Sequence, residues 1–345
     1  MGLKPHRGFE SLSLRHLSAM MYSAPVAQLD RVPGYEPGGR EFESLRAHQY
    51  FLCFLKTNVH LRKQEWSMRL VLLCILTLCS LTSRASIVLD KDSFGQRADT
   101  IHIDIHSIPE PCLSKTKKAF VTDNKFGFDV IDADSNWVIE SFLNAIKPGM
   151  LVLDAGSGYG ALTRSALNRG ATVISNDISK NQLLYNLRHI NAEEKSRLYL
   201  NSKDIRQISL ESDSLDLIVF HRILHFFNGH EIETILTRAF EWLKPGGKVY
   251  IVMLSKDHVG FRDKIFYDPA KKWPGENIVI VKNHLPDQAY ALPKKLHVVS
   301  PETLENRLKE VGFQIEKVDF VSLKKFGAEA NRDGKEAVGI IGLKR

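Results

Sequence analysis

The chain has 345 residues, of which 43% are hydrophobic and 25% charged, and its formal net charge is +7. These values exclude a wholly disordered chain, a collagen-like fibre and a polytopic membrane protein. The positive charge lies mainly before residue 86, since residues 86–345 hold 36 Lys and Arg against 34 Asp and Glu. A nearly neutral body lacks the basic excess of a general nucleic-acid binder, so no nucleic-acid partner is expected.

Residues 1–67 differ in character from the rest of the chain. The hexapeptide at 7–12 returns in similar form at 40–45, but two polar copies cannot stack into a solenoid core. The stretches 24–31 and 39–46 resemble conceptual translations of transfer-RNA genes. We therefore expect residues 1–67 to be an upstream misreading, with a disordered natural extension as the alternative.

Residues 68–85 have the organisation of an export signal. Arg69 follows the initiating Met68, residues 71–81 are almost entirely apolar, and Ser83 and Ala85 are small residues suited to a signal peptidase. The signal predicts a periplasmic or secreted protein that starts at Met68. An uncleaved membrane anchor and a buried element of a cytoplasmic fold are the alternatives.

Residues 86–130 are expected to form an N-terminal arm, and residues 131–345 a domain in which strands and helices alternate. In the arm, isoleucines alternate with polar residues over 99–106, which indicates a short strand or an extended segment. Cys112 is the one cysteine after residue 79, so this part of the chain cannot form an internal disulfide, and no spacing predicts a metal site.

The alternation in the domain predicts an α/β fold with a doubly wound, mostly parallel, seven-stranded sheet and an antiparallel edge strand near the C-terminus. Ser135, Ser179 and Ser300 are suited to cap helices. The predicted elements are helix 135–146, strand 151–153, helix 160–168, strand 172–175, a helix after residue 179, strands 198–200 and 215–220, helix 232–243, strand 249–253, helix 300–311, and strands 313–321 and 336–343.

A long insertion at 254–297 separates two of these elements. It contains four prolines and is rich in Tyr, His, Lys and Trp. A segment of this length between strands is typical of a lid over an active site. Its candidates for lining an acceptor pocket, with ordinary packing as the alternative, are Tyr267, Trp273, His284 and Tyr290.

Three alternate glycines, Gly156, Gly158 and Gly160, directly follow the strand at 151–153. Glycine lets the backbone turn sharply and approach a ligand closely. Asp154 precedes the first glycine by two residues, where a carboxylate suits an ammonium group and repels a pyrophosphate. Asp177 ends the next strand, where it can accept hydrogen bonds from both hydroxyls of a ribose.

Together with Asp204 after the third strand, the 215–219 strand and the Lys-Pro-Gly-Gly turn at 244–247, this loop resembles the class I S-adenosylmethionine-dependent methyltransferases. The resemblance implies the Rossmann-like methyltransferase fold and S-adenosylmethionine as cofactor. It also implies that Asp154 reaches the methionine amino group, and that the three glycines pass beneath the methionine and ribose. The further roles it implies are ribose binding by Asp177, adenine packing by Ile178, contact of Asp204 with the adenine amino group, and contact of the Ile205 N–H with the ring.

An oxygen or nitrogen acceptor can require a base, and His221 and His225 follow the strand at 215–220. Their spacing of four predicts a shared helix face, and histidine titrates in a useful range. The alternative is that both are structural residues near the cofactor.

The proposed lid favours a small-molecule acceptor, with a protein acceptor as the alternative. Two other functions stay open. The loop at 156–161 also satisfies the pattern of an NAD-dependent oxidoreductase, and a protein of this fold can serve as a non-catalytic interaction partner. Export adds a difficulty, because S-adenosylmethionine is an intracellular metabolite.

Overall fold

The computed structural model describes residues 93–115, 119–130, 136–260, 262–263, 278–323 and 333–345. All the described residues belong to one compact unit. The predicted misread segment, the predicted export signal, Tyr267 and Trp273 therefore lie outside the described residues. Within the described ranges, no helix is both long and apolar enough to cross a membrane.

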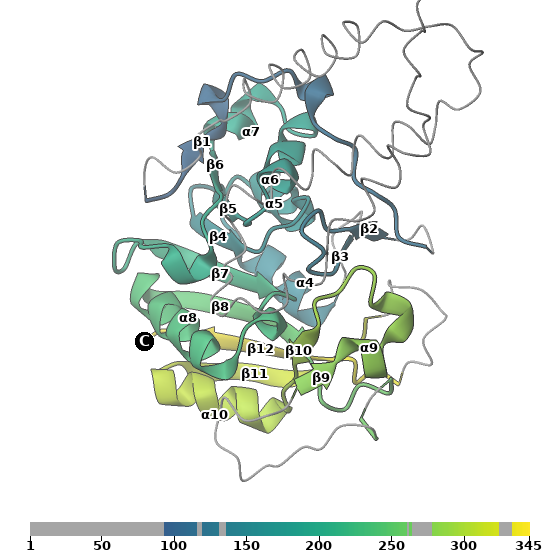
Figure 1. Cartoon of the computed structure of the whole chain (residues 1–345). Helices are drawn as coiled ribbons and strands as arrows, with labels where there is room; N and C mark the ends of the chain where they lie inside the picture. The colour runs from purple at the N-terminus through teal and green to yellow at the C-terminus, as the bar shows by residue number, and fades with distance from the viewer. Residues whose placement is uncertain (1–92, 116–118, 131–135, 261, 264–277, 324–332) are drawn as a thin grey trace, which may run out of the picture. The chain divides into compact units, whose positions relative to one another are not determined.

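An eight-stranded sheet forms the centre of this unit (Figure 1). In spatial order its strands are β1 Gln96–Arg97, β6 Leu198–Asn201, β5 Thr172–Asn176, β4 Leu151–Ala155, β7 Leu215–His221, β8 Leu243–Leu254, β12 Ala337–Leu343 and β11 Gln314–Val321. The five strands from β6 to β8 run parallel, whereas β1, β12 and β11 each pair antiparallel. The predicted α/β class with a mostly parallel sheet is confirmed.

The sheet has eight strands rather than the predicted seven, because the N-terminal arm adds β1 beside β6. A strand of two residues has too short a pattern to be found in the sequence. The isoleucine-rich stretch at 99–106 forms extended chain flanked by two short 3₁₀ helices, η2 Ala98–Thr100 and η3 Ile105–Ser107. Its isoleucines pack, partly buried, against the core.

Helices cover both faces of the sheet (Figure 1). One core contains residues of α4 Trp137–Ala145, α5 Ala161–Leu167 and α6 Lys180–Tyr185, and the other contains residues of α8 Gly229–Trp242 and α10 Pro301–Val311. Along β8, Tyr250 and Val252 enter the first core, whereas Val249 and Ile251 enter the second. Alternate burial on both faces explains why the central strands are continuous apolar runs.

Polar caps determine where several helices begin. As predicted, Ser179 caps α6 and Ser300 caps α10. Helix α4 begins at Trp137, because the side chain of Asn136 accepts two of its first backbone N–H groups, whereas the predicted cap Ser135 lies outside the described residues. Asparagine caps a helix as well as serine does, so the sequence could not separate the two. Further short helices are η4 Asn186–Arg188, α7 Ala192–Ser196 and η7 Pro286–Gln288.

Two small hairpins adjoin the sheet. Strands β2 Ala119–Val121 and β3 Phe128–Val130 form the N-terminal hairpin, residues 119–130. In the insertion, β9 Ile278–Ile280 pairs with β10 Lys295–His297, and α9 Val281–His284 follows β9. The N–H of Gly127 donates to the carbonyl of Ala291 at 2.8 Å. The two hairpins therefore touch, although they lie far apart in the sequence.

Phe142→Ala should lower the free energy of unfolding by about 3–5 kcal/mol, because removal of a buried ring leaves a cavity. Phe142 is fully buried on α4, and its ring centroid lies 5.4 Å from that of Tyr250. Leu113 is 50% exposed, so Leu113→Ala should change the same quantity by less than about 0.5 kcal/mol. Urea denaturation measures both variants, and equal losses would contradict the assigned core.

Candidate cofactor and catalytic site

The loop after β4 has a backbone shape that only glycine adopts readily. Gly156, Gly158 and Gly160 have φ angles of +68°, +55° and +79°, in the left-handed region that side chains disfavour. A Cβ atom on Gly158 would overlap the carboxylate of Asp129, and one on Gly160 would overlap the side-chain amide of Asn186. The loop therefore leaves no room for side chains at these positions, at the sheet edge where ligands of such folds bind.

Asp154 lies on β4 with its carboxylate buried below the glycine loop. Its side chain is 2% exposed, and its Oδ2 atom accepts a hydrogen bond from the Thr163 hydroxyl at 2.7 Å. Burial raises the pKa of Asp154 to about 7. The charges of Asp129 and Asp177 act in the same direction, whereas the hydrogen bond from Thr163 lowers this pKa. A cationic ligand would stabilise the ionised carboxylate, because it would offset both the burial and the like charges.

Asp177 lies on the other side of the loop, directly after β5. Its Oδ2 accepts the N–H of Gly158 at 3.0 Å, and its Oδ1 accepts the N–H of Ser179 at 2.8 Å. Burial, which outweighs these two hydrogen bonds, raises the pKa of Asp177 to about 6. The next residue, Ile178, is 40% exposed although it is apolar. The predicted ribose contact requires a carboxylate that is held in place, and the predicted adenine contact requires an aliphatic side chain beside it.

The N-terminal hairpin contributes two acids that the sequence analysis missed. Asp129 accepts the backbone N–H of Tyr159 in the glycine loop. Asp123 accepts the hydroxyl of Ser179 at 3.0 Å and the amide of Asn181 at 3.2 Å. The hairpin therefore lies against both the glycine loop and the start of α6. No sequence signal pointed to these residues, since they precede the alternating pattern and belong to no motif.

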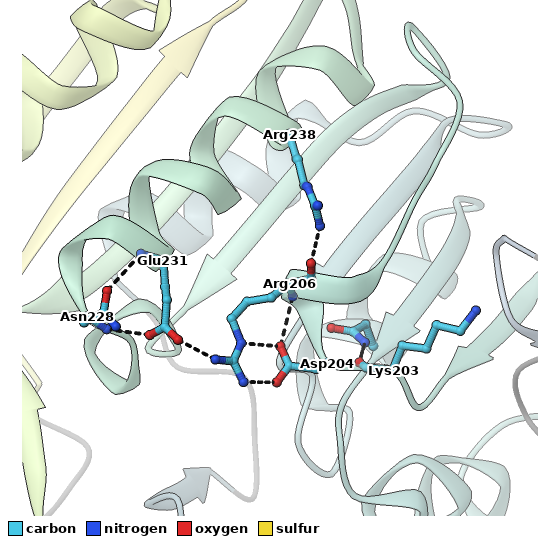
Figure 2. A network of polar contacts seen from close by, with 7 residues as sticks. Lys203, Asp204, Arg206, Asn228, Glu231 and Arg238 are labelled. Carbon is cyan, nitrogen blue, oxygen red and sulfur yellow. Dashed lines mark hydrogen bonds and ion pairs between the residues drawn. The ribbon is translucent and has the colours of Figure 1, made fainter. Parts of the chain in front are cut away.

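Asp204 lies in a network of ion pairs shown in Figure 2. Its Oδ1 accepts the backbone N–H and the Nε–H of Arg206 at 2.9 Å each, and its Oδ2 accepts Nη2 at 2.6 Å. Arg206 also pairs with Glu231 on α8, and Arg238 donates to the Arg206 carbonyl. Burial alone would raise the pKa of Asp204, but the hydrogen bonds and charge of Arg206 outweigh it and hold that pKa below its ordinary value.

This network fixes the orientation of Asp204 and favours its ionised form, in which both oxygens are acceptors. Ile205, which opens the short helix η5 Ile205–Gln207, is 2% exposed. The adenine contacts predicted for both residues stay predictions. Arg206 and Glu231 were not anticipated, although Glu231 could have been found from its capping box with Asn228.

Three histidines gather at the carboxyl end of β7. His221 ends β7, His225 lies in the turn η6 Leu224–Phe226, and His297 ends β10. Burial, and after it the charge of Arg222, lowers the pKa of His221 and of His225 to about 3. Burial also lowers the pKa of His297 to about 4, although a hydrogen bond with the Phe227 backbone opposes this. All three rings are therefore neutral at physiological pH.

The helix face predicted for His221 and His225 is not formed. Helix α8 begins only at Gly229, because Asn228 caps it, so His221 ends strand β7 and His225 lies in the turn η6. They remain close enough for the charge of one to affect the other. His225 is 7% exposed, and among the described residues nothing forms a hydrogen bond with its Nδ1 atom. The described residues contain no group of three His, Cys, Asp or Glu side chains that could hold a metal ion.

The ring of Phe226 packs against His225, with ring centroids 4.2 Å apart, and further aromatic pairs link the N-terminal hairpin to this turn and to the insertion. The ring of Phe226 is 5.4 Å from that of Phe126 in the N-terminal hairpin, and Phe128 of the same hairpin is 5.8 Å from Tyr290 of the insertion. His284 instead bonds to the Ile280 backbone within the insertion. Of the four lid candidates, Tyr290 contacts the N-terminal hairpin, and its role in an acceptor pocket stays a prediction.

Residues 152–247 match a family model described as a methyltransferase domain. Phosphoethanolamine N-methyltransferase 2 of Caenorhabditis elegans is 29% identical over 180 residues, which are 52% of this chain and 39% of that protein. The mitochondrial ubiquinone biosynthesis O-methyltransferase of Homo sapiens is 26% identical over 181 residues, 49% of this chain and 43% of that protein. A solved S-adenosylmethionine-dependent methyltransferase of Methanosarcina mazei is 19% identical, with a TM-score of 0.48 and coverage of 62% of this chain and 99% of its own.

The family match contains the glycine loop and all the cofactor-binding candidates. Residues 152–247 therefore carry a methyltransferase domain, as the resemblance to the class I S-adenosylmethionine-dependent methyltransferases predicted. The enzyme class and the cofactor predicted from the sequence are thereby confirmed at the level of the family. The chain spans less than half the length of the curated relatives named above.

Asp154→Asn should change how stability depends on pH. In the folded state Asp154 keeps its proton up to about pH 7, whereas an unfolded aspartate loses it near pH 4. Between these values the folded state binds more protons, so this group lowers wild-type stability as the pH rises. Asparagine has no such proton, so the variant should gain about 2 kcal/mol relative to wild type between pH 5.5 and 8. Urea denaturation at both pH values tests this, and a difference that does not vary with pH would contradict it.

Proposed function

We propose that the chain is an S-adenosylmethionine-dependent methyltransferase that methylates an oxygen or nitrogen atom of a small-molecule acceptor. The observation that carries this proposal is the pair of buried, interacting carboxylates, Asp154 and Asp177, of which Asp177 accepts the N–H of Gly158 in the glycine loop. S-adenosylmethionine carries an ammonium and a sulfonium cation and a ribose diol. Asp154 would hold the ammonium group, and Asp177 would accept hydrogen bonds from the two ribose hydroxyls.

The remaining candidates surround the adenine end of this ligand. Ile178 would pack on the adenine ring, and Asp204 would accept its amino group while the N–H of Ile205 contacts the ring. The exposed apolar side chain of Ile178 and the fixed, ionised carboxylate of Asp204 support these roles.

A nicotinamide dinucleotide is a poorer match for this loop. Asp154, Asp177 and the hairpin acids Asp123 and Asp129 interact electrostatically with one another around it. A pyrophosphate bridge carries two negative charges, which these carboxylates would repel. The same intact carboxylates and glycines favour cofactor binding over a purely non-catalytic interaction protein.

S-adenosylmethionine supplies, when bound, a methyl group already activated by positively charged sulfur. The chain therefore has to position the acceptor in line and exclude water. His225 is the preferred base: its ring is neutral and its Nδ1 atom has no hydrogen-bond partner among the described residues. It would take the proton that an acceptor hydroxyl or amine loses as the methyl group is transferred. His221, at the end of β7, is the second candidate.

A small-molecule acceptor is supported by the surroundings of His225. Phe226 packs against His225, Phe126 of the N-terminal hairpin packs against Phe226, and the neighbouring imidazole of His297 carries no charge. The relatives named above are, by their names, an N-methyltransferase of phosphoethanolamine and an O-methyltransferase of ubiquinone biosynthesis. A protein acceptor remains the alternative.

Asp177→Ala should weaken S-adenosylmethionine binding by about 10- to 150-fold, because one carboxylate that serves two hydroxyls is lost. Asp319→Ala removes an exposed acid from β11 and should leave the dissociation constant unchanged. Isothermal titration calorimetry measures both variants. Binding of NADH but not of S-adenosylmethionine by the wild-type chain would reverse the proposed function in favour of an oxidoreductase.

His225→Gln should lower kcat by about 100-fold or more, with little change in the KM for S-adenosylmethionine, because it removes the base and not the cofactor site. His230 is exposed on the same segment, and His230→Gln should retain full activity. The assay follows methyl transfer from labelled cofactor to an acceptor obtained by screening small-molecule extracts. Equal activity of both variants would exclude His225 as the base.

A further inference from the structure

A chain of three buried hydroxyl groups runs from the glycine loop to Asp154. Ser157 lies in the loop, Ser175 on β5 and Thr163 on α5, and all three are buried. The Ser175 hydroxyl lies 2.7 Å from that of Ser157 and 3.2 Å from that of Thr163. The Thr163 hydroxyl lies 2.7 Å from Oδ2 of Asp154. No element of the cofactor pattern in the sequence includes Ser175 or Thr163.

The direction of the Thr163 hydrogen bond follows from the atoms present. A threonine hydroxyl has one proton, and an ionised carboxylate can only accept. The Thr163 proton therefore lies in the shorter hydrogen bond, which goes to the charged carboxylate of Asp154. In the longer contact, the Thr163 oxygen accepts a hydrogen bond from the Ser175 hydroxyl. Among the described residues, Thr163 is the side chain that donates to Asp154.

We infer that Thr163 is a positioning residue that keeps the Asp154 carboxylate ionised and turned toward the ammonium group of the cofactor. This inference rests on the proposed function, since it takes the ammonium group to be the partner of Asp154. Helix α5 begins directly after the glycine loop, so the same turn that shapes the loop also places the Thr163 hydroxyl behind Asp154.

The charges that face Asp154 make such a donor necessary. Asp129 approaches from the N-terminal hairpin and Asp177 from the end of β5, and both are negative. Each of them, like burial itself, raises the pKa of Asp154, whereas the Thr163 hydrogen bonds lower it. Without the hydroxyl, Asp154 would keep its proton to higher pH, and a neutral carboxyl holds an ammonium group less strongly.

The test compares two ligands that differ at the ammonium group. S-adenosylhomocysteine has the amino-acid portion, whereas 5′-methylthioadenosine has the same nucleoside and sulfur without it. Their dissociation constants are measured by calorimetry between pH 6 and 8.5 on the full chain. The variants are Thr163→Val, which has the same shape without a hydroxyl, and Thr163→Ser, which keeps the hydroxyl. Ser165→Ala is the matched control, because Ser165 is on the same helix and donates only to the Ala161 carbonyl.

Thr163→Val should weaken S-adenosylhomocysteine binding about tenfold at pH 7.5 and move the pH midpoint of binding up by about one unit. Binding of 5′-methylthioadenosine should not change, Thr163→Ser should restore the wild-type midpoint, and Ser165→Ala should match wild type. If Thr163→Val does not fold, Thr163→Ala replaces it, since it also lacks the hydroxyl.

Two results would overturn the inference alone. An equal loss for both ligands would mean that Thr163 only supports the packing of the loop, and an unchanged midpoint for S-adenosylhomocysteine would mean that Asp154 does not depend on Thr163. A wild-type chain that binds neither ligand would instead overturn the proposed function, and the inference with it.

Discussion

The site depends on one constraint: two carboxylates are buried together, and their hydrogen-bond donors in the described part of the chain carry no charge. Asp154 and Asp177 are almost fully buried, and their hydrogen bonds within the described part of the chain come from neutral donors: a threonine hydroxyl, a glutamine amide and backbone N–H groups. Burial of this kind is costly for a carboxylate, which is why both acids hold their protons to unusually high pH. A ligand that brings positive charge removes that cost, so the unliganded site is electrostatically incomplete.

The two halves of the site differ in charge as well as in position. On the cofactor side, acids surround the glycine loop, whereas on the acceptor side His225 and His297 are uncharged and lie near aromatic rings. When their environments shift the pKa values of two groups in opposite directions, the groups suit different chemical roles. Here the acids suit a cationic ligand, whereas burial, which lowers the pKa of the histidines, leaves their end of the site uncharged.

The sequence predicted the parts of the fold that have strong local signals. Apolar strand runs and capping residues such as Ser300 located the parallel sheet and most helices. The glycine spacing located the cofactor loop, whose positive φ angles only glycine adopts readily. The predictions that failed concern an element that is very short and a segment whose structure depends on residues outside it. Strand β1 has two residues, and the spacing of His221 and His225 suggested a helix because the cap at Asn228 was overlooked.

The residues that complete the site could not be predicted for a different reason. Asp129 and His297 belong to segments on either side of the alternating region, and only the folded chain brings them to it. Arg206 was missed because an arginine after a strand is usually solvated, and its partner Glu231 lies on another element.

The N-terminal hairpin has a consequence for how such enzymes can be recombined. The region that defines the family runs from residue 152 to 247, yet Asp129 precedes it and His297 follows it. A chimera that exchanged only that region between relatives would transplant the glycine loop and leave behind the segments that carry Asp129 and His297. The grafted loop would then lose the carboxylate against which Gly158 is packed.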